Sequence, residues 1–387
     1  MKFIHTADWH LGKLVQGVYM TEDQRFVLDQ LLQVIEHEKP DAVIIAGDLY
    51  DRAVPPTDAV DLLDHILGRI VLEWGIPVLA ISGNHDSPDR LDFGTAIMEG
   101  RGLHLAGRLK KQSKPVVLQD AHGEVHVHLI PYADPAQVRF LLEDDNIRSH
   151  DDAMQALLSN IAREMEPTAR HIVVAHAFVT PSGQKEANTS DAERPLSIGG
   201  TEQVQAEHFG PYHYTALGHL HQAHYVMNEK IRYAGSPLKY SISEERHDKG
   251  FFLVELDGNG QVHVDKIQLH PRRDMRRIEA AMEDIEKHEP SDDYVYVTLL
   301  NESPVLFPME KVRAVYPNAM HVERRVPSAV RMDGQDEEER VNRKQSDQVA
   351  LFAAFYEEVN GGAIQEDKLA LFREVYVDVL REEGEPG

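Results

Sequence analysis

Through the first 240 residues, short apolar runs of strand length alternate with stretches whose apolar positions recur at helical spacing. Residues 27–35 form one such helical stretch, and residues 60–74 form a second, which also carries Leu62 and Ile66 on another flank. This alternation predicts an α/β fold. The broad apolar surface of the second stretch fits a deep core position or a subunit interface, and both interpretations stay open.

The pattern changes after residue 250. Residues 251–269 predict a β-hairpin that turns at 257–260 and closes the first domain. From about residue 272 the alternation restarts and predicts a small mixed α/β unit, which a charged connector and terminal helices follow. We therefore expect four parts: a first domain (1–270), a small α/β domain (271–328), a charged linker (329–345) and a helical pair (346–387).

Two stripes of aromatic and aliphatic residues mark the helical pair, with a stop at Gly361–Gly362 between them. The first stripe consists of Phe352, Phe355, Tyr356 and Val359, and the second of Leu369, Phe372 and Tyr376. Such stripes either pack on their own domain or bind another protein. The long charged connector before them favours a surface for a partner.

Polar side chains follow five of the apolar runs, at the point where each run ends. They are Asp8 and His10, Asp48 and Asp51, Asn84 and His85, His176, and His219 and His221. Ligands in open α/β sheets bind beyond the carboxyl ends of the strands, so we expect the sheet to bring the five clusters together at one rim. A turn explains the Gly83–Asn84 pair, because both residue types are common in turns, but it does not explain His85. The sequence therefore predicts a shared metal site.

The types of these side chains limit the metal. The chain has no cysteine, so a metal must bind oxygen and imidazole ligands, which suit Mn²⁺, Fe²⁺, Zn²⁺ or Mg²⁺. The candidate ligands are Asp8, His10, Asp48, Asn84, His176, His219 and His221. They are too many for one catalytic ion with an open position. They suit two ions that share a carboxylate and clamp both oxygens of a phosphoryl displacement.

The net charge of −25 on 387 residues argues against a general nucleic-acid binder, because phosphate contacts need a basic face. Two divalent ions against two ligating carboxylates would nevertheless leave the site positive and able to attract a phosphate. No apolar run approaches the roughly 20 residues that span a bilayer, and the N-terminal segment turns polar too soon for a secretory signal. We expect no membrane partner and a cytoplasmic location.

The polar clusters lie in a set of motifs that resembles the calcineurin-like metallophosphoesterase superfamily. The motifs are DWH (8–10), GDLYD (47–51), GNHD (83–86), AH (175–176) and GHLH (218–221). The resemblance implies a β-sandwich flanked by helices. It also implies one ion on Asp8, His10, Asp48 and His221. A second ion would then bind to Asp48, Asn84, His176 and His219. His85 would be the histidine that binds no metal, steadies the phosphate and protonates the leaving oxygen, with Asp51 beside it in the catalytic set.

Within that superfamily the chain looks like the SbcD family of bacterial nuclease subunits. The stretches that carry this likeness are HTADWHLG (5–12), GDLYDRAVPP (47–56), ALGHLHQ (216–222) and YAGSPLKYSISE (233–244). The likeness implies a manganese-dependent DNA nuclease that acts in DNA repair, recombination and replication. Together with an ATPase partner, SbcC, it would cut double-stranded DNA ends. Hairpins and single strands would also be substrates. A nucleoid-associated homodimer is implied, joined through helices near 57–74 and 89–100.

The likeness gives the remaining parts roles as well. The small α/β domain would cap the nuclease domain and contact DNA, and the terminal helices would bind the base of the SbcC coiled coil. Arg276, Arg277, Arg324 and Arg325 are candidate DNA contacts, although arginines at strand ends are also commonly only solvated. The rival enzyme is a stand-alone metallophosphatase, which would not need the C-terminal third of the chain. The rival outside enzymology is a scaffold with a dead site, which would not need the complete ligand set.

Overall fold

The computed structural model divides the chain into two compact units, Met1–Arg325 and Val326–Gly387. It describes residues 1–111, 113–182, 188–194, 196, 202–301, 303–325, 352–353, 356 and 364–382. Of the two predicted C-terminal stripes, Phe355 and Val359 lie outside the described residues.

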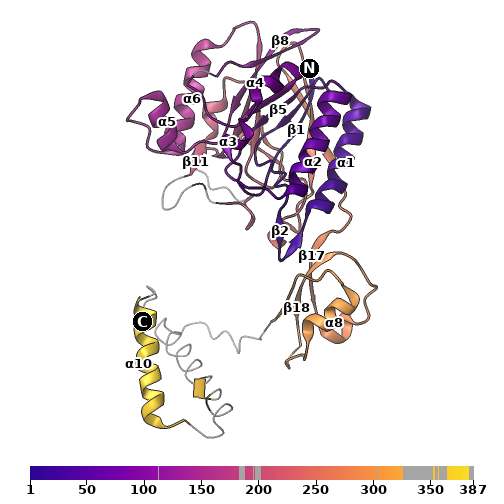
Figure 1. Ribbon diagram of the computed structural model, residues 1–387, viewed down its shortest axis with the longest axis vertical. Helices are drawn as coiled ribbons and strands as arrows, with labels where there is room; N and C mark the ends of the chain where they lie inside the picture. Colours follow the sequence, from indigo (N-terminus) through magenta and orange to yellow (C-terminus); the bar gives the residue numbers. More distant parts are fainter. Residues whose placement is uncertain are drawn as a thin grey trace. The chain divides into compact units, whose positions relative to one another are not determined.

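Two six-stranded sheets make up most of the first unit (Figure 1). The first has the strand order β16-β15-β1-β4-β5-β6. Its strands are β1 (Lys2–Thr6), β4 (Ala42–Ile45), β5 (Val78–Ile81), β6 (Leu103–Ala106), β15 (Gly250–Leu256) and β16 (Val262–Gln268). The strands β1, β4, β5 and β6 run parallel, whereas β15 and β16 form the antiparallel hairpin that the sequence predicts.

The second sheet has the order β13-β14-β12-β9-β8-β7. Its strands are β7 (Val116–Asp120), β8 (Gly123–Ile130), β9 (Arg170–His176), β12 (Tyr214–Gly218), β13 (His224–Val226) and β14 (Asn228–Tyr233). The prediction that one sheet carries all five polar clusters is therefore wrong: β1, β4 and β5 belong to the first sheet, and β9 and β12 to the second. A buried parallel strand has the same kind of apolar sequence in either sheet, so this sequence does not indicate to which of the two sheets the strand belongs.

The two sheets pack face to face, and helices cover the outer faces. On β4, Ala42 and Ile44 belong to the core between the sheets, while Val43 and Ile45 belong to the core under the first helices. Side chains of a strand alternate between faces, which explains this division. Figure 1 shows α1 (Thr21–Glu38) and α2 (Thr57–Leu67) on one side of the sheets, and α5 (Pro135–Leu142) and α6 (His150–Glu164) on the other. The structure thus has the predicted sandwich flanked by helices.

The helix α2, which a π-helical turn continues over Gly68–Glu73, settles one open question. Leu62 and Ile66 are fully buried in the core of the chain itself, so they are not an interface. Large apolar side chains are instead exposed nearby, in and between the short helices α3 (Pro88–Leu91) and α4 (Thr95–Met98): Phe93 is 84% exposed and Ile97 83%.

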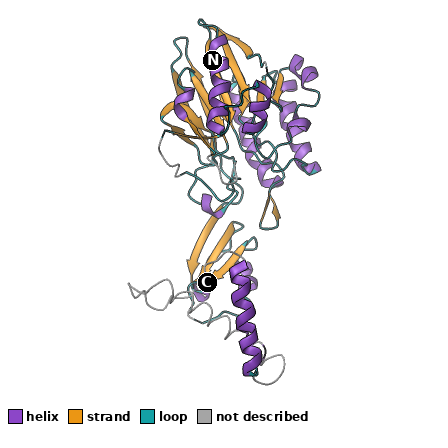
Figure 2. Cartoon of the chain, turned by 90° about the vertical axis from the view of Figure 1, so that its left-hand side faces the viewer, coloured by secondary structure: helices purple, strands orange, loops and turns teal. Residues whose placement is uncertain are grey.

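The alternation after residue 272 forms a small α/β unit. Its elements are β17 (Met275–Ala280), α7 (Met282–Ile285), β18 (Tyr294–Leu299), α8 (Pro308–Val315) and β19 (His321–Arg324). The three strands are parallel and lie side by side (Figure 2). Asp23 of α1 anchors this unit, because its buried carboxylate accepts hydrogen bonds from Arg273 (3.2 Å) and from the Tyr294 hydroxyl (2.7 Å).

Smaller elements complete the described chain. They are β2 (Leu14–Val15), β3 (Val18–Tyr19), β10 (Phe178–Thr180), β11 (Gln203–Gln205), the 3₁₀ turns Glu99–Arg101, Ala206–Phe209 and Ile242–Glu244, and α10 (Glu366–Glu382). Among the helices described, none has the length and apolar character that crossing a bilayer requires.

In the second unit, the two predicted stripes meet. The Phe352 ring stacks on the Phe372 ring of α10, with ring centroids 3.9 Å apart, and Tyr356 and Tyr376 lie beside these two rings. The pairing uses part of each stripe inside the helical pair. Leu371 and Val375, which belong to neither stripe, are 61% and 53% exposed.

Candidate metal centre

The candidate site lies where the carboxyl ends of strands from both sheets meet. Glycines allow this close approach. A Cβ atom on Gly47 would lie 2.3 Å from Nδ1 of His176, and one on Gly218 would lie 2.0 Å from the Ala46 carbonyl oxygen. One on Gly83 would lie 2.1 Å from an Asp48 carboxylate oxygen. The glycines of the GDLYD and GHLH motifs are therefore required by the contact between the two sheet rims, and Gly83 of the GNHD motif by the contact between the loops that follow β4 and β5 of the first sheet.

Four of the candidate ligands leave their strands with a left-handed backbone. Their φ angles are 54° for Asp8, 47° for His10, 50° for Asp48 and 107° for His219. Residues other than glycine adopt this region at a cost of about 1–3 kcal/mol each, and they persist there only where the surrounding structure holds them. The fold therefore holds these four residues in a bend just beyond the ends of their strands.

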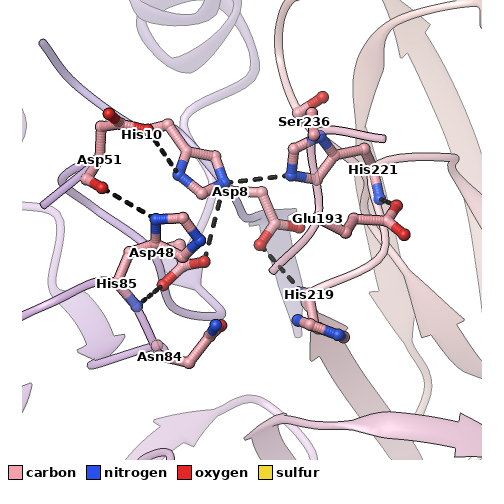
Figure 3. Close-up of polar contacts among 12 residues, drawn as sticks. Asp8, His10, Asp48, Asp51, Asn84, His85, Glu193, His219, His221 and Ser236 are labelled. Atoms are coloured by element: carbon pink, nitrogen blue, oxygen red, sulfur yellow. Dashed lines mark hydrogen bonds and ion pairs between the residues drawn. The ribbon is translucent and has the colours of Figure 1, made fainter. Parts of the chain in front are cut away.

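The seven predicted ligands form one continuous set of contacts, in which His219 takes part through its backbone N–H. Figure 3 labels all of them except His176. His10 Nε2 lies 3.1 Å from His221 Nε2 and 3.7 Å from Asp48 Oδ2. His176 Nε2 lies 3.4 Å from the same Asp48 oxygen and 2.9 Å from Asn84 Oδ1. Asp8 Oδ1 lies 3.8 Å from His176 Nδ1 and accepts the backbone N–H of His219. Asp48 lies between the two histidines, the position that a shared ligand needs.

Hydrogen bonds on the far side fix the tautomers of two of these histidines. Nδ1 of His176 donates to the Ala46 carbonyl at 3.0 Å, and Nδ1 of His221 donates to the Glu244 carboxylate at 2.8 Å. When either ring is neutral, its proton is therefore on Nδ1 and its Nε2 lone pair points into the site. This arrangement is typical of histidines that bind a metal.

Buried charge in the site calls for a cation. Burial raises the pKa of Asp8 well above its usual value. Burial acts in the same direction on Asp48, but the neighbouring His176 and His10 outweigh it and hold the pKa of Asp48 well below its usual value. Burial favours neutral His176, yet the Asp48 and Asp8 carboxylates raise its pKa to about 9. Without a metal, a proton on His176 thus balances the carboxylates.

The residues fit divalent metal ions. Among the described residues, Asp8 Oδ2 is buried without a hydrogen-bond partner, although it is a carboxylate oxygen in the middle of the site. Two sets of side chains bring ligand atoms within 4.8 Å of one another: Asp8, Asp48 and His176 in one, and His10, Asp51 and His85 in the other. Oxygen and imidazole donors of this kind suit Mn²⁺, Fe²⁺ or Zn²⁺.

The structure places both His85 and Asp51 beside the ligands. His85 donates from Nδ1 to the Asp51 backbone carbonyl at 2.8 Å, and its ring meets the His10 ring edge-on, 4.6 Å between centroids. The Asp51 carboxylate instead pairs with Lys13 at 2.7 Å and lies 3.7 Å from Nδ1 of His10. Asp51 therefore contacts His85 through its backbone and faces a candidate ligand with its side chain.

Sequence reasoning missed the residues that support the ligands from behind. The Gln24 amide of α1 donates to the Trp9 and His10 carbonyls, and Asp86 accepts the backbone N–H groups of Leu49, Tyr50 and Gly83. Burial, with Asp48 nearby, raises the pKa of Asp86 to about 7. The position of Asp86 inside the GNHD motif was the signal in the sequence that could have found it. Gln24 gave no such signal, because a polar residue on a helix is ordinarily exposed.

The four candidate DNA-contacting arginines do not share one face. Neighbouring residues alternate across the sheet of the small unit, so Arg276 lies on the face of β17 opposite to Arg277. Arg276 pairs with Asp293 at 2.7 Å and lies over the Tyr316 ring, whereas the Arg277 residue is exposed. Arg325 pairs with both oxygens of Glu279. DNA contact by these arginines stays a prediction.

Two family models match the chain: calcineurin-like phosphoesterase over residues 1–223, and type 5 capsule protein repressor C-terminal domain over residues 271–360. The SbcD subunit of the nuclease SbcCD from Staphylococcus epidermidis is 33% identical over 376 residues, which cover 95% of this chain and 97% of that protein. The chain belongs to the SbcD family. Membership of the SbcD family confirms the predicted family, fold class and enzyme class, a metal-dependent phosphodiesterase with nuclease function.

Two solved structures also align with this SbcD family member. The crystal structure of TT1561 from Thermus thermophilus matches with a TM-score of 0.38 and 11% identity, over 68% of this chain and 98% of that one. The structure of a dimetal phosphatase from Danio rerio matches with a TM-score of 0.39 and 13% identity, over 70% of this chain and 96% of that one. The fold assignment rests on the family model.

Proposed function

We propose that this chain hydrolyses phosphodiester bonds of DNA at a site for two divalent metal ions, as the nuclease subunit of a complex with an SbcC ATPase. The observation that carries the proposal is the convergence of seven oxygen and imidazole ligands around Asp48, whose carboxylate faces His10 on one side and His176 on the other. Asp8, His10, Asp48 and His221 would hold one ion. Asp48, Asn84, His176 and His219 would hold the other.

Two bound ions would lower the pKa of an attacking water and neutralise the charge that develops on the phosphate. His85 supplies the proton transfer. Its Nδ1–H donates to the Asp51 carbonyl, which orients the ring and leaves Nε2 as the nitrogen that gives a proton to the leaving oxygen. Asp51 would act through its neighbours, with its carbonyl on His85 and its carboxylate toward His10.

The remaining features of the proposal concern assembly. Mn²⁺ is the proposed metal. Exposed Phe93 and Ile97 support a homodimer contact at residues 89–100. The helical pair (346–387), joined through the linker (329–345), would bind SbcC, while the small domain (271–328) would contact DNA beside the nuclease domain (1–270). We place the protein at the nucleoid in the cytoplasm, where it would process DNA ends, hairpins and single strands in repair and recombination.

The test compares labelled DNA with p-nitrophenyl phosphate in the presence of Mn²⁺, with and without SbcC. We expect the chain to cut single-stranded DNA without SbcC, and to cut double-stranded ends only with SbcC and ATP. The Asp48→Ala variant should cut neither kind of DNA, and EDTA should abolish both activities of the wild type. Asp48→Ala removes the carboxylate that both ions would share. Turnover of p-nitrophenyl phosphate without any cleavage of DNA would favour a stand-alone phosphatase and contradict the proposal.

A further inference from the structure

Glu244, at the end of the 3₁₀ turn Ile242–Glu244, is fully buried. Both oxygens of its carboxylate nevertheless have polar partners. Oε1 accepts from Nδ1 of His221 and from the Ser190 hydroxyl, each at 2.8 Å. Oε2 lies 2.7 Å from the Lys249 ammonium and 3.2 Å from the Tyr240 backbone N–H. A buried carboxylate is costly unless it is paired in this way.

Lys249 connects Glu244 to a second point on His221. Its buried ammonium donates to the His221 carbonyl oxygen at 2.8 Å and to the Ser236 hydroxyl at 2.7 Å. Glu193 holds a third point, because its carboxylate accepts the His221 backbone N–H at 2.8 Å (Figure 3). His221 is therefore held at its N–H, its carbonyl and its Nδ1.

Only Nε2 of His221 lies away from these charged groups, 3.1 Å from Nε2 of His10. A buried ion pair contributes little net stability, since desolvation offsets most of the attraction. Stability alone thus gives a weak reason for burying Glu244 and Lys249 behind this histidine. Their geometry has a direct consequence for a ligand instead: a carboxylate on Nδ1 fixes the ring and makes Nε2 a stronger donor to a metal.

We propose that Glu244, held by Lys249, is the positioning residue that makes His221 a metal ligand, and that it sets the affinity of one of the two ions. This inference rests on the proposed two-ion function. Glu193 accepts the backbone N–H of His221, so it holds the chain at this residue and not Nδ1 of the ring.

The test replaces Glu244 with Gln, which keeps the shape of the side chain and removes its charge. Calorimetric titration with Mn²⁺ counts the bound ions and gives both affinities, and thermal unfolding of the metal-free protein reports on the fold. We expect Glu244→Gln to lose about 10–100-fold in affinity at one ion and to keep the other. Glu245→Gln is the matched control, because this neighbour bonds to the Arg277 backbone and should leave both affinities unchanged.

The outcomes separate the two proposals. If the wild type binds no Mn²⁺, the proposed two-ion function fails. If the wild type binds two ions and Glu244→Gln binds both with unchanged affinity, or loses both together, the role of Glu244 is refuted. If Glu244→Gln does not fold, Glu244→Asp decides, since it keeps the charge for Lys249 and withdraws the carboxylate from His221 by about 1.5 Å. Two intact ion sites in Glu244→Asp, or failure of this variant to fold, would overturn the inference.

Discussion

Replacement of Gly83 by Ala should damage the reaction far more than the fold. The new Cβ would lie 2.1 Å from Oδ1 and 2.5 Å from the backbone nitrogen of Asp48. Neither atom yields freely, because Oδ1 accepts the His85 N–H at 2.9 Å and the Asp48 backbone is already in a left-handed conformation. To restore ordinary contact, Asp48 must retreat by about 1 Å.

The two consequences differ in size. Forcing one extra methyl group into a packed site costs about 1–3 kcal/mol of unfolding free energy, which a domain of this size tolerates. A displacement of about 1 Å at a reacting centre costs roughly 10²-fold in rate. The displaced group here is the carboxylate that both ions would share, so we expect Gly83→Ala to lose at least that much in kcat/KM.

The assay measures manganese-dependent cleavage of a labelled single strand together with urea unfolding of the same preparation. Gly68→Ala is the control, since a Cβ there meets no atom of the described residues within 4 Å and the backbone is helical. It should leave cleavage unchanged. If Gly83→Ala cuts DNA within twofold of the wild-type rate, Asp48 can move without penalty, and the argument that its position is decisive is wrong.

Three further variants test other parts of the molecule. His85→Ala should keep both metal equivalents in calorimetry and lose about 10²–10⁴ in rate, and the loss of one equivalent would make His85 a ligand. Deletion of residues 346–387 should leave a folded, metal-binding protein that no longer co-purifies with SbcC; retention of SbcC at wild-type levels contradicts this. Arg170 lowers the pKa of Asp120, so this carboxylate stabilises the fold above about pH 4 and loses its effect as the pH falls. Asp120→Asn should therefore destabilise the protein in urea at pH 7 and progressively less toward pH 3, whereas an equal loss at both values would exclude the ion pair.

The candidate ligands could be predicted residue by residue because they follow buried parallel strands. Such a strand reads as an unbroken apolar run, so Asp48 after Ala42–Ile45 and His176 at the end of β9 stand out against their surroundings. The assignment of strands to sheets could not be predicted. It depends on which strand pairs with which, and the apolar run of β9 does not differ in kind from that of β4.

The residues that support the ligands were also out of reach. Glu244 meets His221 from 23 positions along the chain, and Gln24 meets His10 from 14 positions away. Each is a polar residue in a segment where polar residues are ordinary, and only the tertiary fold buries it. The sequence also did not show that the four arginines of the small unit do not share one face. Which face a residue lies on follows from the alternation of side chains along a strand, and the sequence defines the bounds of these strands only loosely.

The division of the ligands between the two sheets also has a consequence for how the protein is made. Asp8, His10, Asp48 and Asn84 come from the first 84 residues, whereas His176, His219 and His221 arrive only with the second sheet. A nascent chain that has not yet reached β9 therefore carries an incomplete set and has no competent centre. Once both halves are joined, ions bound as proposed to ligands of both sheets would hold the sheets together, since any opening of the sandwich would release them. The loaded protein should then resist unfolding in proportion to the logarithm of the free metal concentration.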